Sequence, residues 1–189
     1  MPYRKSPIHL DHIYHIYNRG VDKNNIFFQK SDWINFYFKM QKYFKPEYVS
    51  VLAYCLMQNH FHLLIYAHSD QFVSKALQPF FVSYVTTINK YQKRVGPLFQ
   101  GPFKSKEVDS DESLLHLSRY IHRNPVEAGI VLNPDEWRHS SFPVYKGLRR
   151  DGFVKTDMIL DIMGGLVFYE KFVEDYSCMV LDKSLTFDG

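Results

Sequence analysis

The chain has 189 residues, of which 46% are hydrophobic and 17% aromatic, and its formal net charge is +3. Length and apolar content suit one packed domain and exclude an intrinsically disordered protein, while the charge is well below the excess typical of charge-driven nucleic-acid binding. No apolar run is long enough to cross a membrane and the start of the chain lacks a signal segment, so we expect a cytoplasmic protein with no membrane partner.

A strand and a helix are predicted before residue 45. Residues 12–19 are rich in aromatic and β-branched side chains, which favours a β-strand, and the Gly, Asp and Asn residues of 20–25 break it. Ser31 is the expected N-cap of a helix from Asp32 to about Tyr43. Four of its side chains recur at helical spacing and are expected in the core: Trp33, Phe36, Tyr37 and Met40.

The next two strands form a predicted hairpin that carries a histidine pair. Residues 48–57 read as a strand in which Cys55 is a buried free thiol, and a short turn at 58–59 leads into the next strand. Because side chains alternate between the faces of a strand, His60 and His62 share one face and Phe61 lies on the other. Two such imidazoles are half of a divalent-metal site. Taken alone, the pattern also fits two polar residues on a solvated sheet face.

A long helical segment follows over residues 71–94, in which Pro79 introduces either a kink or a split. Its basic end includes Lys93 and Arg94. Their charge fits two compatible readings, a contact with phosphate and a favourable placement against the helix dipole.

After an irregular loop, residues 103–108 are predicted to form a short strand. Lys104 and Lys106 share one of its faces, and Phe99 and Phe103 lie near them in the chain. Paired lysines beside exposed aromatic rings suit a nucleic-acid backbone with base stacking. The alternative is an edge strand that its lysines protect from pairing.

The helix expected over residues 111–124 carries the second motif. His116, Tyr120 and Asn124 are spaced by four residues and so form a polar line on one face, with Arg119 and Arg123 flanking the tyrosine. The proline after Asn124 is expected to end the helix. Its buried stripe is Leu114, Leu117 and Ile121.

The signal weakens beyond residue 137. The segment that contains Arg138, Ser140 and Ser141 fits either a phosphate contact or a simple turn. Residues 156–180 read as short helices on either side of Gly164–Gly165. This region is either a packed extension or a surface for a partner.

The two motifs combine into one candidate site. A usable divalent site needs three ligands with positions left open for substrate. His60 and His62 supply two ligands, and Asn124 supplies the third if its helix packs across the histidine strand. Tyr120 then lies beside the metal, where its phenolate form is easier to reach, and it can attack a phosphodiester.

At this point the chain resembles a known family. Residues 57–64 (MQNHFHLL) followed by 120–126 (YIHRNPV) are similar to the Y1 transposases, which are HUH-type single-tyrosine enzymes, and the similarity is strongest to the IS200-like and REP-associated branch. Residues 18–20 (NRG) and 137–141 (WRHSS) extend the resemblance over roughly residues 10–145. We therefore expect a catalytic domain at residues 1–150 and a helical C-terminal extension at 151–189.

The resemblance implies an α+β fold with a central antiparallel β-sheet flanked by helices, like ferredoxin and RRM domains. It implies Mg²⁺ or Mn²⁺, single-stranded DNA with hairpin structure, and a 5′-phosphotyrosine intermediate in an enzyme that acts as a monomer or homodimer. His60 and His62 match the metal pair, Tyr120 the nucleophile, and Asn124 a ligand position where relatives often have Gln. With the basic segments above, the expected DNA-binding residues are Arg19, Lys93, Arg94, Lys104, Lys106, Arg119, Arg123 and Arg138.

Two other functions stay open on the sequence. One is a non-catalytic binder of single-stranded nucleic acid on an RRM-like sheet, with Tyr14, Tyr54 and Phe61 stacking on bases. The other is a metal-dependent hydrolase in which His60 and His62 activate water. Metal-dependent cleavage excludes the first alternative, and covalent attachment of protein to DNA excludes the second.

Overall fold

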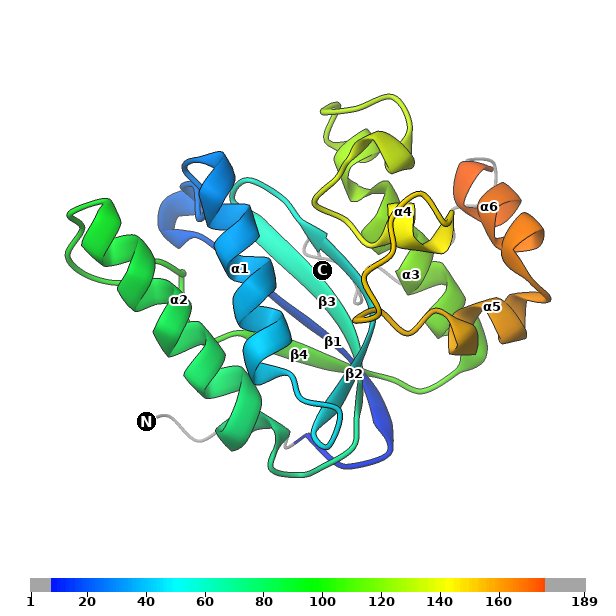
Figure 1. Ribbon diagram of the computed structural model, residues 1–189, viewed down its shortest axis with the longest axis horizontal. Helices are drawn as coiled ribbons and strands as arrows, with labels where there is room; N and C mark the ends of the chain where they lie inside the picture. Colours follow the sequence, from blue (N-terminus) through cyan, green and yellow to red (C-terminus); the bar gives the residue numbers. More distant parts are fainter. Residues whose placement is uncertain (1–7, 176–189) are drawn as a thin grey trace.

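A four-stranded antiparallel sheet forms the centre of the computed structural model, which describes residues 8–175 (Figure 1). The strands are β1 (His12–Arg19), β2 (Val49–Leu56), β3 (His60–Ala67) and β4 (Lys104–Val108), in the order β2-β3-β1-β4. Helices α1 (Lys30–Tyr43) and α2 (Gln78–Tyr91) follow β1 and β3 in the chain. This is the order of ferredoxin-like and RRM-like domains, so the predicted α+β class is confirmed.

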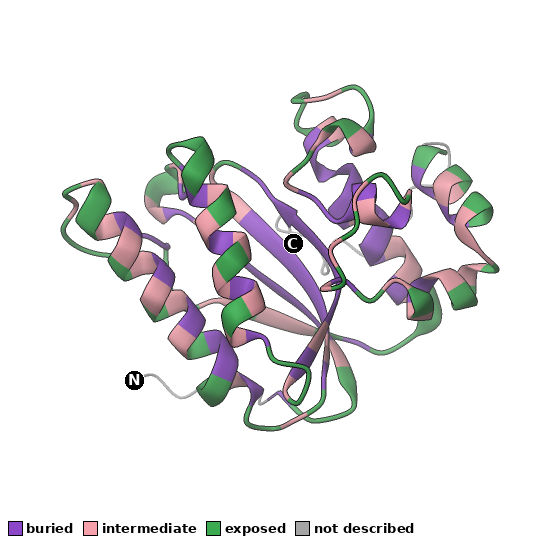
Figure 2. Cartoon of the chain, in the orientation of Figure 1, coloured by how far each residue is buried: buried purple, intermediate pink, exposed green. Residues whose placement is uncertain are grey.

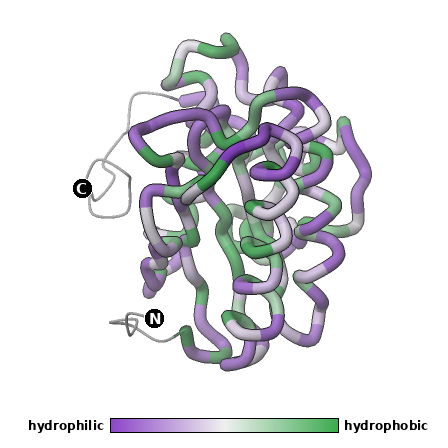
Figure 3. Tube along the Cα trace, turned by 90° about the vertical axis from the view of Figure 1, so that its left-hand side faces the viewer, coloured by the Kyte–Doolittle hydropathy of each residue, from purple (hydrophilic) through white to green (hydrophobic). Residues whose placement is uncertain are grey.

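Helices α1 and α2 cover one face of the sheet. Phe61, Leu63 and Ile65 point to this face and are fully buried, and the Phe36 ring of α1 lies 5.5 Å from that of Phe61. Figure 2 shows buried residues along the strands, with exposed residues on the outer turns of both helices. Figure 3 shows the same arrangement as hydrophobic segments gathered along the central strands. No helix within residues 8–175 is long and apolar enough to cross a membrane.

The start of α1 differs from the expectation. The helix begins at Lys30 with Gln29 as its N-cap, so the predicted N-cap Ser31 is wrong. The carboxylate of Asp32 accepts hydrogen bonds from the backbone amides of Phe28 (2.8 Å) and Gln29 (3.0 Å). This capping box therefore starts the helix two residues earlier than a cap at Ser31 would.

The long segment after β3 stays helical but changes helix type just before Pro79. A π-helical turn (Val73–Leu77) runs directly into α2, and Pro79 is in the first turn of α2. The helix ends at Tyr91, so Lys93 and Arg94 lie just beyond it.

Helix α3 (Asp111–Glu127) packs on the opposite face of the sheet, against β2 and β3. Its predicted apolar stripe is confirmed, since Leu114, Leu117 and Ile121 are at most 1% exposed. The helix continues through Pro125 to Glu127, so the predicted end at Asn124 is wrong. Pro125 lies in the last turn, where its missing amide removes only one backbone hydrogen bond.

Short helices follow α3, and α5 and α6 pack against it on the side away from α1 and α2 (Figure 1). They are the 3₁₀ turn Pro134–Glu136, α4 (Phe142–Tyr145), α5 (Asp157–Met163) and α6 (Leu166–Glu174); another 3₁₀ turn, Val21–Lys23, follows β1. The predicted break at Gly164–Gly165 separates α5 from α6, and Gly164 and Gly165 have φ angles of 84° and 119°. The predicted helical residues 176–180 and Cys178 lie outside the described residues.

The outer edge of β2 is covered by segments from the second half of the chain. The Leu56 amide donates to the His139 carbonyl (2.9 Å), the Ser141 amide to the Tyr54 carbonyl (2.9 Å), and the Lys155 amide to the Val51 carbonyl (2.8 Å). These bonds pair backbone groups that an edge strand otherwise exposes. The free thiol of Cys55 is fully buried on this strand, as predicted.

A buried polar chain joins α6, α3 and the segment beside β2. Nδ1 of His122 lies 2.8 Å from the Tyr169 hydroxyl, and its Nε2 lies 2.7 Å from Oγ of Ser141. Burial lowers the pKa of His122 from its ordinary value of 6.5 to about 3. The imidazole is therefore neutral in the folded protein at neutral pH.

Acid should weaken the fold through His122. Its folded pKa is below its unfolded one, so stability is complete above about pH 6.5 and is lost as the pH falls toward 3. At pH 5 the free energy of unfolding should be about 2 kcal/mol lower than at pH 7 from this residue alone. Urea unfolding at both pH values measures the loss, which His122→Gln should reduce by that amount. An equal pH dependence in the variant would contradict the assignment.

Candidate metal and nucleophile site

The predicted ligands His60, His62 and Asn124 come together between β3 and α3. The rings of His60 and His62 are 5.2 Å apart and nearly perpendicular, on the face of the sheet that α3 covers. Nε2 of His60 lies 3.0 Å from Oδ1 of Asn124. Alternation along β3 places the two imidazoles on one face, and the packing of α3 brings the amide to them.

The surroundings of His60 favour a cation. Its Nδ1 lies 2.6 Å from Oδ1 of Asn59 while its Nε2 faces Oδ1 of Asn124, so each ring nitrogen faces an amide oxygen. A neutral imidazole has one N–H and can donate to only one of these oxygens. A metal ion bound by both His60 Nε2 and Asn124 Oδ1 would satisfy these two atoms together.

His62 is held by a second histidine. Its Nδ1 lies 2.8 Å from Nε2 of His15, and both residues are fully buried. Burial, then the charges of His15, His60 and Arg19, lower the pKa of His62 well below its ordinary value. A neutral ring with Nδ1 engaged in this way presents Nε2 as the coordinating atom, as metal-bound histidines usually do.

The donor set therefore fits a divalent ion. Two imidazole nitrogens and an amide oxygen can supply three positions of a six-coordinate site, leaving the others for water or phosphate. No group of three or more His, Cys, Asp or Glu side chains within residues 8–175 is placed to hold a metal. The site depends on the Asn124 amide as its third ligand.

Tyr120 lies next to the histidine pair. Its ring meets that of His62 edge-on, with centroids 5.4 Å apart at 85°, and the side chain is half-buried. Asn124 follows one turn later on α3. The spacing of four residues thus places the candidate nucleophile and the third ligand on the same side of the helix.

Three of the predicted DNA-binding residues line the same face. Arg19 is opposite His60 in the β1–β3 register, and Lys104 and Lys106 are opposite Tyr17 and His15 in the β1–β4 register. Residues paired in this way point to the same side of the sheet. Nζ of Lys104 lies 5.8 Å from the Tyr17 ring centroid. β4 is also an edge strand of the sheet, as the alternative reading of its lysines requires.

The other predicted DNA-binding residues are placed elsewhere. Lys93 is exposed beyond the end of α2, and Arg94 lies over the Phe28 ring and donates to the Pro97 carbonyl. Arg138 is exposed near the covered edge of β2. Phe99 and Phe103, expected as exposed stacking rings, instead pack around Phe81: Phe99 is 8% exposed and Phe103 stacks on Phe81.

Arg119 and Arg123 are buried beneath α6, in place of the exposed positions that the sequence suggested. They are 1% and 8% exposed. The guanidinium of Arg119 lies 4.3 Å from the centroid of the Phe172 ring, and that of Arg123 donates to the Val173 carbonyl (3.0 Å) and pairs with Glu127 (3.1 Å). A contact of either guanidinium with phosphate would require α6 to move away.

Replacing Arg119 should therefore lower the stability of the fold rather than remove a contact with DNA. Arg119→Ala removes the stacking on Phe172 and the hydrogen bond to its carbonyl (3.5 Å), and should lower the free energy of unfolding by about 3 kcal/mol. Urea unfolding measures this, with the exposed Lys171→Ala of α6 as a control expected within about 0.5 kcal/mol of wild type. Unchanged stability with weakened DNA binding would support the phosphate contact instead.

Sequence reasoning did not assign the supporting residues of the site. The sequence alone does not single out His15 for this site, and it predicts Asn59 only as part of a turn. Strand alternation places His15 on the face of Tyr17 and Arg19, but the register of β1 against β3, which pairs Tyr17 with His62, is a tertiary property. His116, the first residue of the predicted polar line, lies against Arg119 and the Phe172 ring.

Comparisons with known proteins identify the family and support the fold. Residues 9–124, more than half of the chain and including both histidines, Tyr120 and Asn124, match the family described as "Transposase IS200 like". The chain belongs to this family. Its structure is similar to that of a REP-associated tyrosine transposase bound to a REP hairpin, with a TM-score of 0.61 and 17% identity over 79% of this chain and 88% of that one. Comparison with curated proteins found no significant match.

Proposed function

We propose that the protein cleaves and rejoins single-stranded DNA through a covalent bond to Tyr120. The observation that carries this proposal is the contact of the Tyr120 ring with His62, next to the His60–Asn124 pair. A positioned phenol beside a cation-binding group is the arrangement that phosphodiester attack requires. Membership of the IS200-like transposase family supports the same chemistry.

His60, His62 and Asn124 are the residues that would hold Mg²⁺ or Mn²⁺. When bound, the ion polarises a phosphate and neutralises charge that develops on it. Attack by the Tyr120 oxygen forms an O–P bond and breaks the bond from phosphorus to the 3′ oxygen, which leaves as a 3′ hydroxyl with a proton. The product is a 5′-phosphotyrosine. Because the ester is retained, a 3′ hydroxyl can reverse the step without ATP.

The proposed substrate is a single strand with hairpin structure. The similar solved structure is bound to a REP hairpin, and the exposed cations of this chain suit a DNA backbone. Arg19, Lys104 and Lys106 flank the histidine pair and are proposed to contact phosphates near the reacting one. Lys93, Arg94 and Arg138 are proposed to contact more distant parts of the DNA.

A pure binding role receives less support. The rings that a stacking platform would use, Tyr14, Tyr54 and Phe61, are at most 2% exposed, so no base can lie on them. Helix α3 covers the β2–β3 part of the sheet face that an RRM-like binder leaves open. The hydrolase alternative is decided by the products of the reaction.

A covalent-adduct assay tests the proposal. Labelled single-stranded DNA from the flanks of the gene, with its hairpins intact, is incubated with protein and Mn²⁺ or Mg²⁺ and run on a denaturing gel. We expect a protein–DNA band that disappears with chelator. Cleavage without this band would indicate the hydrolase, and binding without cleavage across all flanking hairpins would indicate the binder.

A further inference from the structure

A cavity of about 830 Å³ lies away from the candidate metal site, between α1 and residues 135–151. Tyr54 and Leu56 of β2 line it. Leu56 is opposite Phe61, which contacts α1, whereas Cys55 is opposite His62. The cavity therefore opens on the α1 side of the β2 edge, across the sheet from the histidine pair and Tyr120.

Aromatic rings form one wall of the cavity. The Trp33 ring stacks on that of His139, with centroids 4.8 Å apart at 21°, and Tyr37 and Phe38 continue the wall along α1. Phe38 is 62% exposed, which is unusual for a phenylalanine in a helix interior. The indole N–H groups of Trp33 and Trp137 both donate to the Leu56 carbonyl (3.0 and 3.3 Å), so the position of the wall is fixed.

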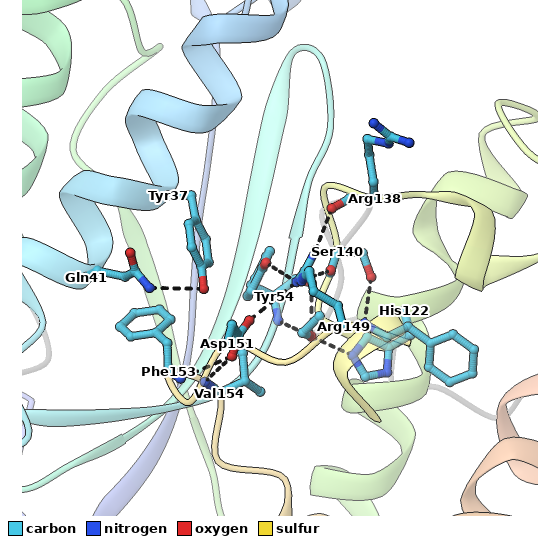
Figure 4. Close-up of polar contacts among 12 residues, drawn as sticks. Tyr37, Gln41, Tyr54, His122, Arg138, Ser140, Arg149, Asp151, Phe153 and Val154 are labelled. Carbon is cyan, nitrogen blue, oxygen red and sulfur yellow. Dashed lines mark hydrogen bonds and ion pairs between the residues drawn. The ribbon is translucent and has the colours of Figure 1, made fainter. Parts of the chain in front are cut away.

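Cations surround this wall. Lys30, Arg138 and Arg150 line the cavity, and within residues 8–175 their side chains make no hydrogen bond or ion pair. In Figure 4 the Arg138 guanidinium points away from the polar cluster beneath it. Burial, then the charges of Arg138, Arg149 and Lys30, lower the pKa of His139 to about 4, so its ring is neutral at neutral pH.

The acidic residues that line the cavity already have partners within the chain. So does Arg149, the fourth basic residue of the lining. Asp135 pairs with Lys146 (3.2 Å), and the Glu136 carboxylate accepts from Asn133 (2.8 Å). Arg149 is bonded to the Tyr54 hydroxyl (2.6 Å), to the Ser140 carbonyl (3.0 Å) and to Asp151 (3.5 Å), as Figure 4 shows. The three cations without such partners are thus available to an anionic ligand.

We propose that this cavity is a second DNA-binding subsite, which takes an unpaired nucleotide of a single strand. The base would lie on the exposed Phe38 ring beside the edge of Trp33, since the rings of Phe27 (4.9 Å) and His139 (4.8 Å) stack on Trp33. Arg138, Arg150 and Lys30 would contact the adjoining phosphates. Aromatic surface beside arginines is what sequence-tolerant binding of single strands uses. The inference rests on the proposed function only for the identity of the partner, single-stranded DNA, and needs no cleavage.

Tryptophan fluorescence tests the subsite directly. Trp33 and Trp137 are the only two tryptophans of the chain, and their rings are 6.5 Å apart beside the cavity. The full chain is titrated without metal with an oligothymidylate of about ten nucleotides. We expect quenching, and an affinity about tenfold weaker in Arg138→Ala/Arg150→Ala. The control Lys75→Ala/Lys171→Ala removes two exposed charges elsewhere and should stay within about twofold of wild type.

A photocrosslinking experiment locates the contact. An oligonucleotide with 4-thiothymidine at each position in turn should crosslink to peptides that contain Trp33 or residues 137–139. The inference is overturned if anisotropy shows DNA binding without tryptophan quenching, or if duplex DNA or free thymidine monophosphate quenches as strongly as the oligothymidylate. It is also overturned if the control Lys75→Ala/Lys171→Ala loses as much DNA affinity as Arg138→Ala/Arg150→Ala. Because no metal is present, these results are independent of whether the covalent adduct forms.

Discussion

Tyr120→Phe should abolish the covalent protein–DNA adduct and slow DNA cleavage by at least about a thousandfold. The substitution removes only the hydroxyl, and the half-buried ring can keep its edge-on contact with His62. Stability and DNA affinity should therefore stay close to those of wild type. Denaturing gels measure the adduct, and fluorescence anisotropy on the same DNA measures binding.

Tyr17→Phe is the matched control. Tyr17 lies on the same face of the sheet, with its ring 6.2 Å from that of His62, but it is 8% exposed and burial raises the pKa of its phenol. Removal of the Tyr17 hydroxyl should leave formation of the protein–DNA adduct intact. If Tyr17→Phe eliminates the adduct while Tyr120→Phe retains it, the nucleophile has been assigned to the wrong element.

His60→Ala should weaken Mn²⁺ binding by at least about a hundredfold, since removal of a supporting residue alone typically costs ten- to a hundredfold. His60 is half-buried, so the variant should still fold. Its effect on metal binding is therefore easier to interpret than that of a change at the fully buried His62. Isothermal titration calorimetry and the electron paramagnetic resonance of free Mn²⁺ measure affinity without reference to activity. Adduct formation at low metal should fall in parallel.

His68→Ala serves as the comparison for this experiment. His68 follows the same strand but is exposed, and its Nε2 contacts Oγ of Ser50 (2.8 Å). Its loss should leave Mn²⁺ affinity within about twofold of wild type. Equal Mn²⁺ affinity in His60→Ala and wild type would show that the histidine pair is not the metal site.

The sheet and its main helices could be predicted because their signals are local. Alternation along residues 60–67 and the four-residue spacing in α3 each define a buried face without reference to the rest of the chain. Element ends were less predictable. Asp32 caps α1 from inside the helix, and Pro125 is tolerated in the last turn of α3, so standard start and stop signals misplaced both boundaries.

Parts of the candidate site could be predicted for the same reason. His60 and His62 share a face by alternation, and Tyr120 and Asn124 by helical spacing, but only the packing of α3 across β3 brings the two pairs together. The environment of Arg119 could not be read from the sequence. A basic residue beside a candidate nucleophile suggests a phosphate contact, and only the docking of α6 places this guanidinium on Phe172. The cavity beside Trp33 likewise depends on residues 135–151 returning to β2.

The packing of α6 on α3 bears on how many copies of the chain one reaction needs. Arg119 and Arg123 bind carbonyls of α6, and α3 in turn holds Tyr120 against the histidines of its own chain. Each chain then carries both halves of the proposed chemistry. A mixture of His60→Ala and Tyr120→Phe proteins should not complement to restore the adduct, and adduct yield per DNA-bound chain should not change on dilution.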